Sequence, residues 1–504
     1  MEALKTIRPE LLTLTQEQFA VLMPYFIVFG GAVLAIIGSV LRFISPKWPV
    51  FLLTLATVAA GMFFSLNLMS GATLPLFNGM MVSDSYSHFF NMVFLAAAGL
   101  TALSSFRYLD REGLQHPEYY VLLLFSALGM MLLASSMELI VLFIALELMS
   151  LAVYVLVGFR RADRRSNEAA MKYFILGAVA SAVLLYGAAL LYGCTGHTDL
   201  QGILHSVQGR PEAMTPLFVL GAALVLAGFL FKVASVPFHM WMPDVYEGAP
   251  VPVTGFMTTG LKAAAFAALF RIFVSLGYGA GEMGLSQIVQ RHFHDVLWVC
   301  AVATMVVGNF VALTQTNLKR MLAYSSIAHT GYLLIGLIAG PHTEHGFAPG
   351  VLYVLVYAIM NLGAFIVLTL LSTRDDSGLN LHDLSGLSQR HPWLAFSLAV
   401  FLLSMAGIPP TAGFAAKYLL FYSAVQANEI PLVVIGVLCS AVSVYYYLRV
   451  LVYMYMRDPQ GSPGVLRVSV WSGVAVAAMV TLTLQIGVLP EKMVHIAKKA
   501  VTSL

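Results

Sequence analysis

The chain has few charged residues and almost no cysteine. Only 10% of its 504 residues are Asp, Glu, Lys or Arg, whereas soluble domains carry roughly 25%. Its three cysteines, Cys194, Cys300 and Cys439, lie far apart and form no C-x-x-C motif, so no iron–sulfur or zinc site is encoded. No glycine-rich dinucleotide fingerprint follows a strand. The formal net charge of +3 is too small to indicate nucleic-acid binding.

Long apolar runs take the place of charge, since 59% of the residues are hydrophobic. A membrane-spanning helix needs about 20 apolar residues, and barrel strands instead alternate over about 10 residues. The sequence therefore predicts an all-α polytopic protein, with residues 1–504 in a single membrane domain. We predict fourteen spans, at 21–44, 49–70, 85–106, 119–135, 137–159, 168–193, 215–236, 251–277, 293–314, 318–339, 347–372, 393–426, 430–456 and 465–488.

Basic residues are concentrated in alternate connections between these spans. If the N-terminus is outside, the inner connections hold most of them, and the outer ones only Arg210 and Arg291. The positive-inside rule then predicts a protein of the bacterial inner (cytoplasmic) membrane with both termini periplasmic. The basic run from Arg160 to Arg165 is interpreted as an orientation signal at the lipid headgroups, with docking of a neighbouring subunit as the alternative.

Two proline-broken helices indicate an internal repeat. Residues 119–277 and 293–456 each form a block of five spans, and the blocks are flanked by 21–106 and 465–488. The fourth span of each block ends or breaks at proline, at Pro237 in the first and at Pro409-Pro410 in the second. Five spans per block make the second copy inverted. Inverted repeats with interrupted helices are typical of transport sites near the bilayer midplane.

Four ionisable side chains lie deep inside predicted spans, namely Glu147, Lys232, Lys262 and Lys417. A charge at this depth costs several kcal/mol and usually marks an ion pathway. We predict that Glu147 pairs with Lys232 and that the pairing changes with the charge of the next site; the alternative is a static ion pair between two helices. Lys262 falls midway along its span and is expected to face water or polar groups, with snorkelling to the interface as the alternative.

Lys417 follows the second broken helix and is predicted to be the exit site. Its alternatives are snorkelling and a structural tie to carbonyls freed at Gly407. Two arginines nearer to helix ends, Arg271 and Arg449, are interpreted as interface anchors.

Two histidines are candidate proton relays, because imidazole titrates near neutral pH. His239 follows the first break, and His329 shares a helix face with Ser325 and Tyr332. For each, a structural histidine is an equal alternative. Asp244 and Glu247 lie in the connection after the first break, where they either admit protons from the cytoplasm or fix the loop.

Three segments carry a resemblance to a known family: FKVASVPFHMWMPDVYEGAPVPVTGF, LKRMLAYSSIAHTGY and GIPPTAGFAAKYLLF. They resemble the subunit N family of bacterial respiratory complex I, the NADH:quinone oxidoreductase, and the likeness spans nearly the whole chain. The resemblance implies a fourteen-helix antiporter-like subunit beside subunits L, M, A, J and K, joined through them to the hydrophilic redox arm.

The same resemblance implies roles for individual residues. Glu147 and Lys232 match the acid and lysine of the first half-channel, Lys262 the central lysine, and Lys417 the terminal lysine, where subunit M typically has glutamate. Flavin mononucleotide, iron–sulfur clusters and quinone are expected in partner subunits, and no cofactor is expected in this chain.

Two other functions stay open. One is a subunit of a multi-subunit cation/proton antiporter that works without redox partners. The other is a structural subunit that only bridges its neighbours.

Overall fold

The structure is a computed structural model that describes residues 15–40, 47–209, 215–278, 287–343, 346–376, 378–459 and 470–504. The predicted start of the last span, at 465, lies outside these residues. The helices are α1 (Gln16–Val40), α2 (Lys47–Leu68), α3 (Ser85–Arg111), α4 (Glu118–Ser135), α5 (Leu139–Val157), α6 (Arg164–Thr195), α7 (Leu200–Gly209), α8 (Pro216–Lys232), α9 (Trp241–Gly248), α10 (Val251–Phe256), α11 (Lys262–Ser275), α12 (Gln287–Ala312), α13 (Leu318–Ala339), α14 (Ala348–Leu371), α15 (Leu387–Arg390), α16 (Pro392–Ala406), α17 (Ala412–Gln426), α18 (Ile430–Met456), α19 (Val470–Val488) and α20 (Glu491–Val501).

The predicted all-helical membrane fold is confirmed. In the described part of the chain, 12 helical segments are long and apolar enough to cross a membrane, and two shorter apolar helices, α8 and α16, add to them. The burial of these segments differs widely: 94% of the most apolar window of Leu318–His342 is buried, against 33% for Ile430–Met456. The segment containing α13 is thus a central element, whereas α18 presents much of its surface outward.

Two spans are interrupted beside prolines. The first, α8, ends at Lys232, and α9 begins only at Trp241, with Pro237 between them. The second, α16, ends at Ala406, and α17 begins at Ala412, after Pro409 and Pro410. Proline lacks a backbone N–H and cannot continue the helical ladder, so both breaks leave helix-end carbonyls in the interior.

A π-helical turn divides the span that carries Lys262. This turn, η5 (Met257–Leu261), separates α10 from α11 and ends directly before Lys262. Such single turns occur mostly inside α-helices and often at functional sites. The continuous apolar run gives no sequence signal for it.

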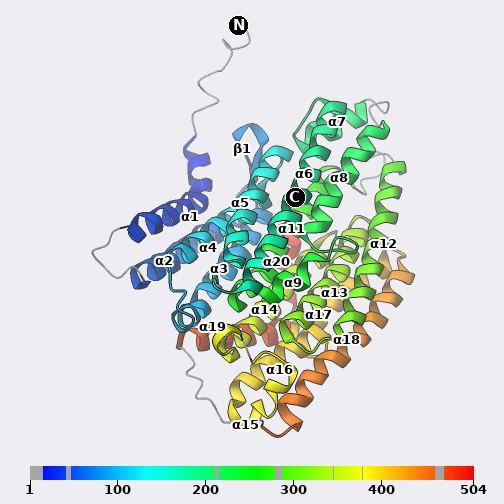
Figure 1. Cartoon of the computed structure of the whole chain (residues 1–504). Helices are drawn as coiled ribbons and strands as arrows, with labels where there is room; N and C mark the ends of the chain where they lie inside the picture. The colour runs from blue at the N-terminus through cyan, green and yellow to red at the C-terminus, as the bar shows by residue number, and fades with distance from the viewer. Residues whose placement is uncertain are drawn as a thin grey trace.

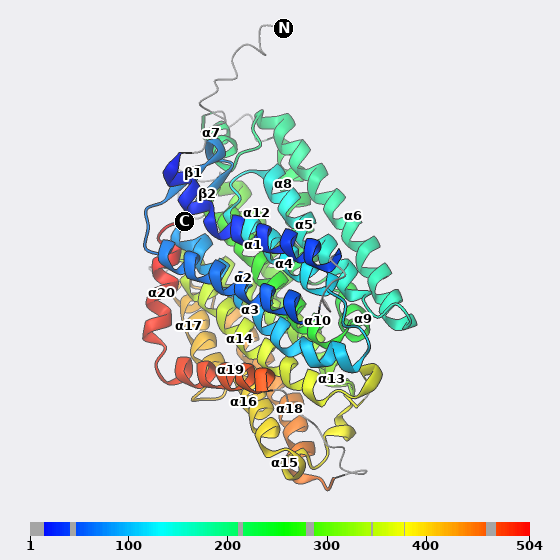
Figure 2. The ribbon, with the colours of Figure 1, turned by 90° about the vertical axis from the view of Figure 1, so that its left-hand side faces the viewer.

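Several elements outside the spans were not predicted. A short antiparallel hairpin joins β1 (Leu74–Leu76) to β2 (Met81–Ser83) through the 3-10 turn η3 (Phe77–Gly79). The helices α7 and α20 lie near this hairpin in Figures 1 and 2, so we call this the hairpin end of the bundle. Along α20, Ala497 and Ala500 are buried, while Lys492 and Lys499 are exposed.

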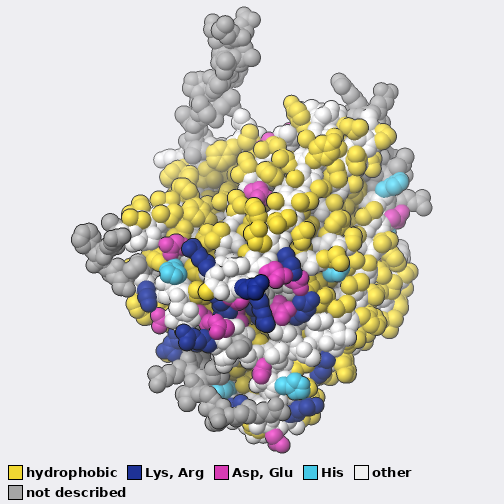
Figure 3. All heavy atoms as spheres, viewed as in Figure 1, with side chains coloured by type: hydrophobic (Ala, Val, Ile, Leu, Met, Phe, Trp, Pro, Cys, Tyr) yellow, Lys and Arg dark blue, Asp and Glu magenta, His cyan; other side chains and the backbone are white. Residues whose placement is uncertain are grey.

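The helices form an elongated bundle. Figure 1 shows α1 and α2 on one flank and α12 and α18 on the other, with α13, α14 and α17 between them. In the quarter-turn view, α6 runs along one edge and α19 lies across α14 and α16 (Figure 2). Figure 3 shows hydrophobic side chains over most of the upper face and charged side chains gathered in one lower area. We call the end with these charges the charged end.

Candidate functional site: a row of buried lysines

Lys232 is the last residue of α8, so the break at Pro237 leaves its ammonium inside the protein. The side chain donates hydrogen bonds to Ser150 Oγ, at 2.9 Å, and to Tyr154 OH, at 3.3 Å, both on α5. Its Nζ also lies 5.7 Å from the centre of the Tyr154 ring. Two neutral hydroxyls therefore hold this cation.

Glu147 lies one helical turn from Ser150 on α5 but does not bind Lys232 directly. The ion pairs of the described residues do not include one between them, and Glu147 Oε1 is buried without a hydrogen-bond partner. The rest of this glutamate is half-buried. The structure thus puts both residues of the predicted pair in one region, in a state where Lys232 contacts Ser150 and Tyr154 instead.

A small cavity joins Lys232 to Lys262. It is lined by these two lysines and by Met149, Tyr173, Trp241, Tyr246, Met257 and Leu261. Trp241 donates to the Phe231 carbonyl at 3.0 Å, and its ring stacks on Tyr173, which fixes α9 against the open end of α8. The interrupted helix therefore builds a wall of the space between the two amines.

Lys262 is 2% exposed and lies in the middle of the protein. Its Nζ donates to the Ser326 carbonyl at 2.7 Å, to Ser326 Oγ at 2.6 Å and to Thr330 Oγ1 at 2.9 Å. Thr330 in turn donates to the carbonyl of Val233, at the end of α8, at 2.7 Å. Burial and these contacts exclude snorkelling for Lys262.

His329, 1% exposed on α13, stands beside the Lys262 contacts. Its Nδ1 is 2.7 Å from Tyr353 OH and its Nε2 is 3.3 Å from Tyr447 OH. Tyr447 shares a further short hydrogen bond with Ser325. The ring of Tyr357, whose hydroxyl donates to Ser326 Oγ at 2.6 Å, lies 5.1 Å from the imidazole. The predicted serine and tyrosine environment of His329 is therefore present, with most of its tyrosines supplied by other helices.

Lys417 is 4% exposed and contacts the end of the other broken helix. Its Nζ donates to the carbonyls of Met405, at 2.8 Å, and Ala406, at 3.3 Å, and to Ser440 Oγ at 3.0 Å. A cation is stabilised at a helix C-terminus, where partial negative charge collects. The structure thus shows the contact expected from a tie to freed carbonyls and excludes snorkelling.

Tyr332 lies between His329 and Lys417. Its ring centre is 5.6 Å from the imidazole centre and 4.9 Å from Lys417 Nζ. The Tyr332 hydroxyl accepts from Asn309 Nδ2 at 3.2 Å, and Asn309 Oδ1 accepts from Tyr446 at 3.1 Å. The Tyr332 ring therefore packs against both His329 and Lys417, and its hydroxyl is held by Asn309.

In the part of the chain that the structure describes, none of these amines is bonded to a carboxylate, although Glu147 lies near Lys232. Among the ion pairs of the described residues, none includes Lys232, Lys262 or Lys417. An unpaired buried ammonium is costly even when it is hydrogen-bonded. Each amine is instead held by neutral hydroxyl or carbonyl oxygens.

The remaining predicted residues lie nearer the surface. His239 is half-buried between α8 and α9, and its Nδ1 has no hydrogen-bond partner. Asp244 is 2.9 Å from both Lys172 and Arg320, and Glu247 is 2.8 Å from Arg320. Partial burial raises the pKa of Asp244, but Lys172 and Arg320 outweigh that effect and hold the pKa below its ordinary value. Asp244 is therefore ionised at neutral pH and fixes this connection.

One sequence interpretation is wrong, and another is wrong for one of its residues. Arg271 is not an interface anchor, because it is 2% exposed and makes two hydrogen bonds to Asp84, at 2.9 and 3.0 Å, and one to the Ala134 carbonyl, at 2.6 Å. Arg160 does not reach lipid headgroups, because it is 6% exposed and bonded to Tyr108 and Glu112. Arg271 was judged from its distance to a helix end and Arg160 from its place in a basic connection, and neither criterion shows a carboxylate brought in by another segment.

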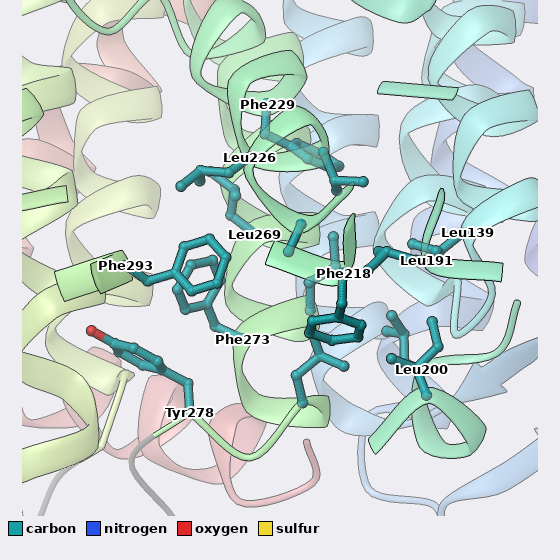
Figure 4. Close-up of a pocket in the computed structure, with 15 residues that line it drawn as sticks. Leu139, Leu191, Leu200, Phe218, Leu226, Phe229, Leu269, Phe273, Tyr278 and Phe293 are labelled. Carbon is teal, nitrogen blue, oxygen red and sulfur yellow. The ribbon is translucent and has the colours of Figure 1, made fainter. Parts of the chain in front are cut away.

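A separate apolar pocket lies toward the hairpin end. Apolar side chains of α5, α6, α7, α8, α11 and α12 line it, and Tyr278 is the one hydroxyl-bearing residue among them (Figure 4). Neither Lys232 nor Lys262 lines it. It therefore has no part in the lysine row.

Comparison with known proteins places these residues in a family. Residues 136–443 match the family model described as NADH:quinone oxidoreductase/Mrp antiporter, TM. The chain is 46% identical over 431 residues to NADH-quinone oxidoreductase subunit N of Trichlorobacter lovleyi, covering 86% of each chain. It is 43% identical to subunit N 2 of Rhizobium meliloti, covering 89% of this chain and 90% of that one.

The chain belongs to the subunit N family of NADH-quinone oxidoreductases.

Solved structures agree with this family. A chain of respiratory complex I from Thermus thermophilus superimposes with a TM-score of 0.79 at 35% identity, covering 94% of this chain and 99% of that one. A chain of the Mrp complex from Dietzia has a TM-score of 0.81, covering 96% and 97%, but only 21% identity. The Mrp likeness shows a shared fold, while the subunit N relatives carry the family.

Proposed function

We propose that this chain is a proton-translocating membrane subunit of an NADH-quinone oxidoreductase, coupling quinone reduction in partner subunits to proton movement. The observation that carries the proposal is the row of three buried, unpaired lysines joined by hydroxyls and His329. A static scaffold gains nothing from amines that are costly to bury. A proton pathway requires groups of this kind.

Each residue of the row has a proposed role. Glu147 and Lys232 form the first half-channel, and Lys232 moves from Ser150 and Tyr154 toward Glu147 when the charge of the next site changes. Lys262 is the central carrier, His329 passes the proton onward, and Lys417 is the terminal carrier. His239 relays protons at the first break.

The proposal includes an orientation and a location. The charged end faces the cytoplasm and the hairpin end faces the periplasm, with both termini periplasmic in the bacterial inner membrane. Residues 119–277 and 293–456 act as two inverted repeats, each supplying one interrupted helix. The positive-inside rule supports this orientation.

The redox chemistry belongs to other subunits. Subunits M, K, J, A and L are the proposed membrane neighbours and connect the chain to the hydrophilic arm. Flavin mononucleotide, iron–sulfur clusters and quinone are assigned to partner subunits. This chain supplies the ion pathway.

Replacing Lys262 by Met tests the function. Methionine keeps most of the side-chain length but cannot carry a proton, so the assembled complex is expected to lose most of the pumping that depends on this subunit. The measurement is protons moved per NADH oxidised by the purified complex in quinone-containing vesicles, followed with a pH-sensitive dye. Lys492→Met, on the exposed face of α20, is the matched control and should pump normally.

Two results would contradict the proposal. Unchanged pumping with Lys262→Met, and likewise with Lys232→Met, would support a structural bridge. Sodium/proton exchange by vesicles that receive neither NADH nor quinone would support the antiporter alternative, which the family description also covers.

A further inference from the structure

A second group of buried charges lies at the charged end, outside the lysine row. It consists of Glu112 after α3, Arg160 between α5 and α6, Lys319 on α13, and Asp376 in the 3-10 turn η8 (Arg374–Asp376). We call these four residues the inner cluster. Their side chains are only 2%, 8%, 3% and 9% exposed, respectively.

The members of the inner cluster contact one another continuously. Arg160 Nη2 is 3.1 Å from Glu112 and 3.4 Å from Asp376, and Lys319 Nζ is 3.5 Å from the other oxygen of Asp376. Tyr108 accepts a hydrogen bond from Arg160 at 2.7 Å and donates to Asp376 at 2.8 Å. Two cations and two carboxylates balance, so the cluster can gain or lose a proton without stranding a large net charge.

Stability alone does not explain the inner cluster. Replacing buried ion pairs by apolar residues is often neutral or stabilising, because the desolvation of the charges offsets their attraction. The cluster also reaches solvent at its rim, where Arg111 contacts Glu112 and Asp163 contacts Arg160, with side chains 35% and 29% exposed. Water at this rim can therefore exchange protons with a group that is otherwise enclosed.

Helix α13 connects the inner cluster to the lysine row. Lys319, Ser326 and Thr330 are spaced by seven and four residues, which puts them on one face of the helix, and seven residues correspond to about 10.5 Å along its axis. Ser326 and Thr330 are the residues that hold Lys262. Ala323, which is also buried, lies between Lys319 and Ser326 on this face.

Helix α9 lies along the same face of α13. The carbonyl of Ala249, directly after α9, accepts from Lys319 at 2.5 Å. Tyr246 on α9 lies near Ser326 and lines the cavity shared by Lys232 and Lys262. One short helix thus contacts both the inner cluster and the environment of the central lysine.

We propose that the inner cluster is the site where a proton from the cytoplasm is loaded before it passes to Lys262, with Lys319 as the releasing group. This rests on the proposed function. The Lys319 ammonium loses a proton, the hydroxyls of Tyr246 and Ser326 pass it on, and neutral Lys262 gains it. A proton from water then returns to Lys319 by way of Asp376. The charged or titratable groups around Lys319 are Tyr108, Glu112, Arg160, Glu247 and Asp376.

Two substitutions of Lys319 distinguish a role in proton transfer from a purely structural role. Lys319→Arg keeps a cation beside Asp376 but does not release a proton at any working pH. Lys319→His is shorter, but imidazole holds and releases a proton near pH 6.5. Proton loading therefore predicts that the histidine variant pumps better than the arginine variant, with activity shifted to lower pH than in the wild type. It also predicts that Lys319→Arg falls to the level of Lys262→Met.

The measurement is protons moved per NADH as a function of pH, in vesicles containing the assembled complex. Controls are Lys47→Arg and Asp110→Asn, an exposed pair at the same end of the bundle whose side chains are 46% and 65% exposed. Both should pump normally.

Pumping by Lys319→Arg that equals or exceeds that of Lys319→His would overturn the loading site. If both variants fail to pump or to assemble, Asp376→Asn is the deciding test of the loading site, because it removes the carboxylate charge and keeps the size of the side chain. Normal pumping in that variant overturns the proposal, and loss to the Lys262→Met level supports it. Normal pumping by Lys262→Met would instead overturn the proposed function itself.

Discussion

At Lys417 the charged group depends on the residue that ends the neighbouring helix. Gly407 follows α16 with a φ of +83°, in the left-handed region. A Cβ atom at this position would lie 3.0 Å from Lys417 Cδ and 3.6 Å from Nζ. The glycine therefore permits both the turn and the close approach of the amine to the Met405 and Ala406 carbonyls.

Gly407→Ala tests this dependence. The left-handed conformation costs a non-glycine residue about 1–2 kcal/mol, and the new methyl group pushes Lys417 away from the carbonyls. We expect lower pumping together with a lower unfolding temperature of the complex. Gly79→Ala is the control, since its φ is +84° and its Cβ would meet no atom within 4 Å. Equal pumping by the two variants would contradict a role for the amine position.

The burial of single residues could be predicted where its cost was visible in the sequence. Lys262 and His329 interrupt apolar runs, so the sequence predicted polar surroundings for them, although it left snorkelling open for Lys262. Tyr353, Tyr357 and Tyr447 could not be singled out in this way, because the chain has 22 tyrosines and a tyrosine at a helix face is compatible with lipid, core or site. Their contribution depends on which helices pack together.

Among the elements, α11 carries both Lys262 and a second buried cation. Nine residues beyond the lysine, Arg271 binds Asp84, which also caps α3 by accepting from Ser87 N at 2.7 Å. The same guanidinium reaches the end of α4 through the Ala134 carbonyl. This ion pair therefore fixes the hairpin end of α11 against α3 and α4.

Breaking the pair should destabilise this region strongly. Asp84→Asn keeps a capping side chain but leaves Arg271 buried without a counter-charge, which costs about 3–5 kcal/mol. Adding Arg271→Met should recover part of this loss, because it removes the unpaired charge. The unfolding temperatures of the two single variants and the double variant check this in the purified complex. If the changes in unfolding temperature of the two single variants simply add in the double variant, Asp84 and Arg271 are not energetically coupled.

The elements themselves were predicted unevenly. Spans were recognisable because a bilayer demands about 20 apolar residues, and the prolines marked both interruptions. The π turn before Lys262 and the short helix α9 were not predicted, because one changes only the hydrogen-bond spacing within an apolar run and the other occupies a polar connection. Both lie beside the central lysine, where function departs from regular helical geometry.

At the scale of the whole molecule, the row runs across both halves of the chain. Lys232 and Lys262 precede α12, whereas His329 and Lys417 follow it, and Tyr332 stands between the last two. A single path through these groups is in series. If one substitution blocks this path, a second substitution along the same path should therefore reduce proton pumping very little further.

The double variant Lys262→Met/Lys417→Met tests the series arrangement. We expect its pumping to equal that of the more defective single variant, since residues that act as a unit are strongly non-additive. The measurement is again protons moved per NADH in vesicles. If the losses of pumping in the two single variants add fully in the double variant, the chain contains two independent proton paths.

The inner cluster also bears on how the protein is made. Glu112 and Arg160 leave the ribosome long before Lys319, and Asp376 follows only after α14 has been synthesised. During membrane insertion the early segments therefore hold Arg160 with Tyr108, Glu112 and Asp163 before Asp376 is available. The inner cluster is complete only after Lys319 and Asp376 in the second half of the chain have been synthesised. Correct assembly of the first half therefore depends on these charged residues of the second half.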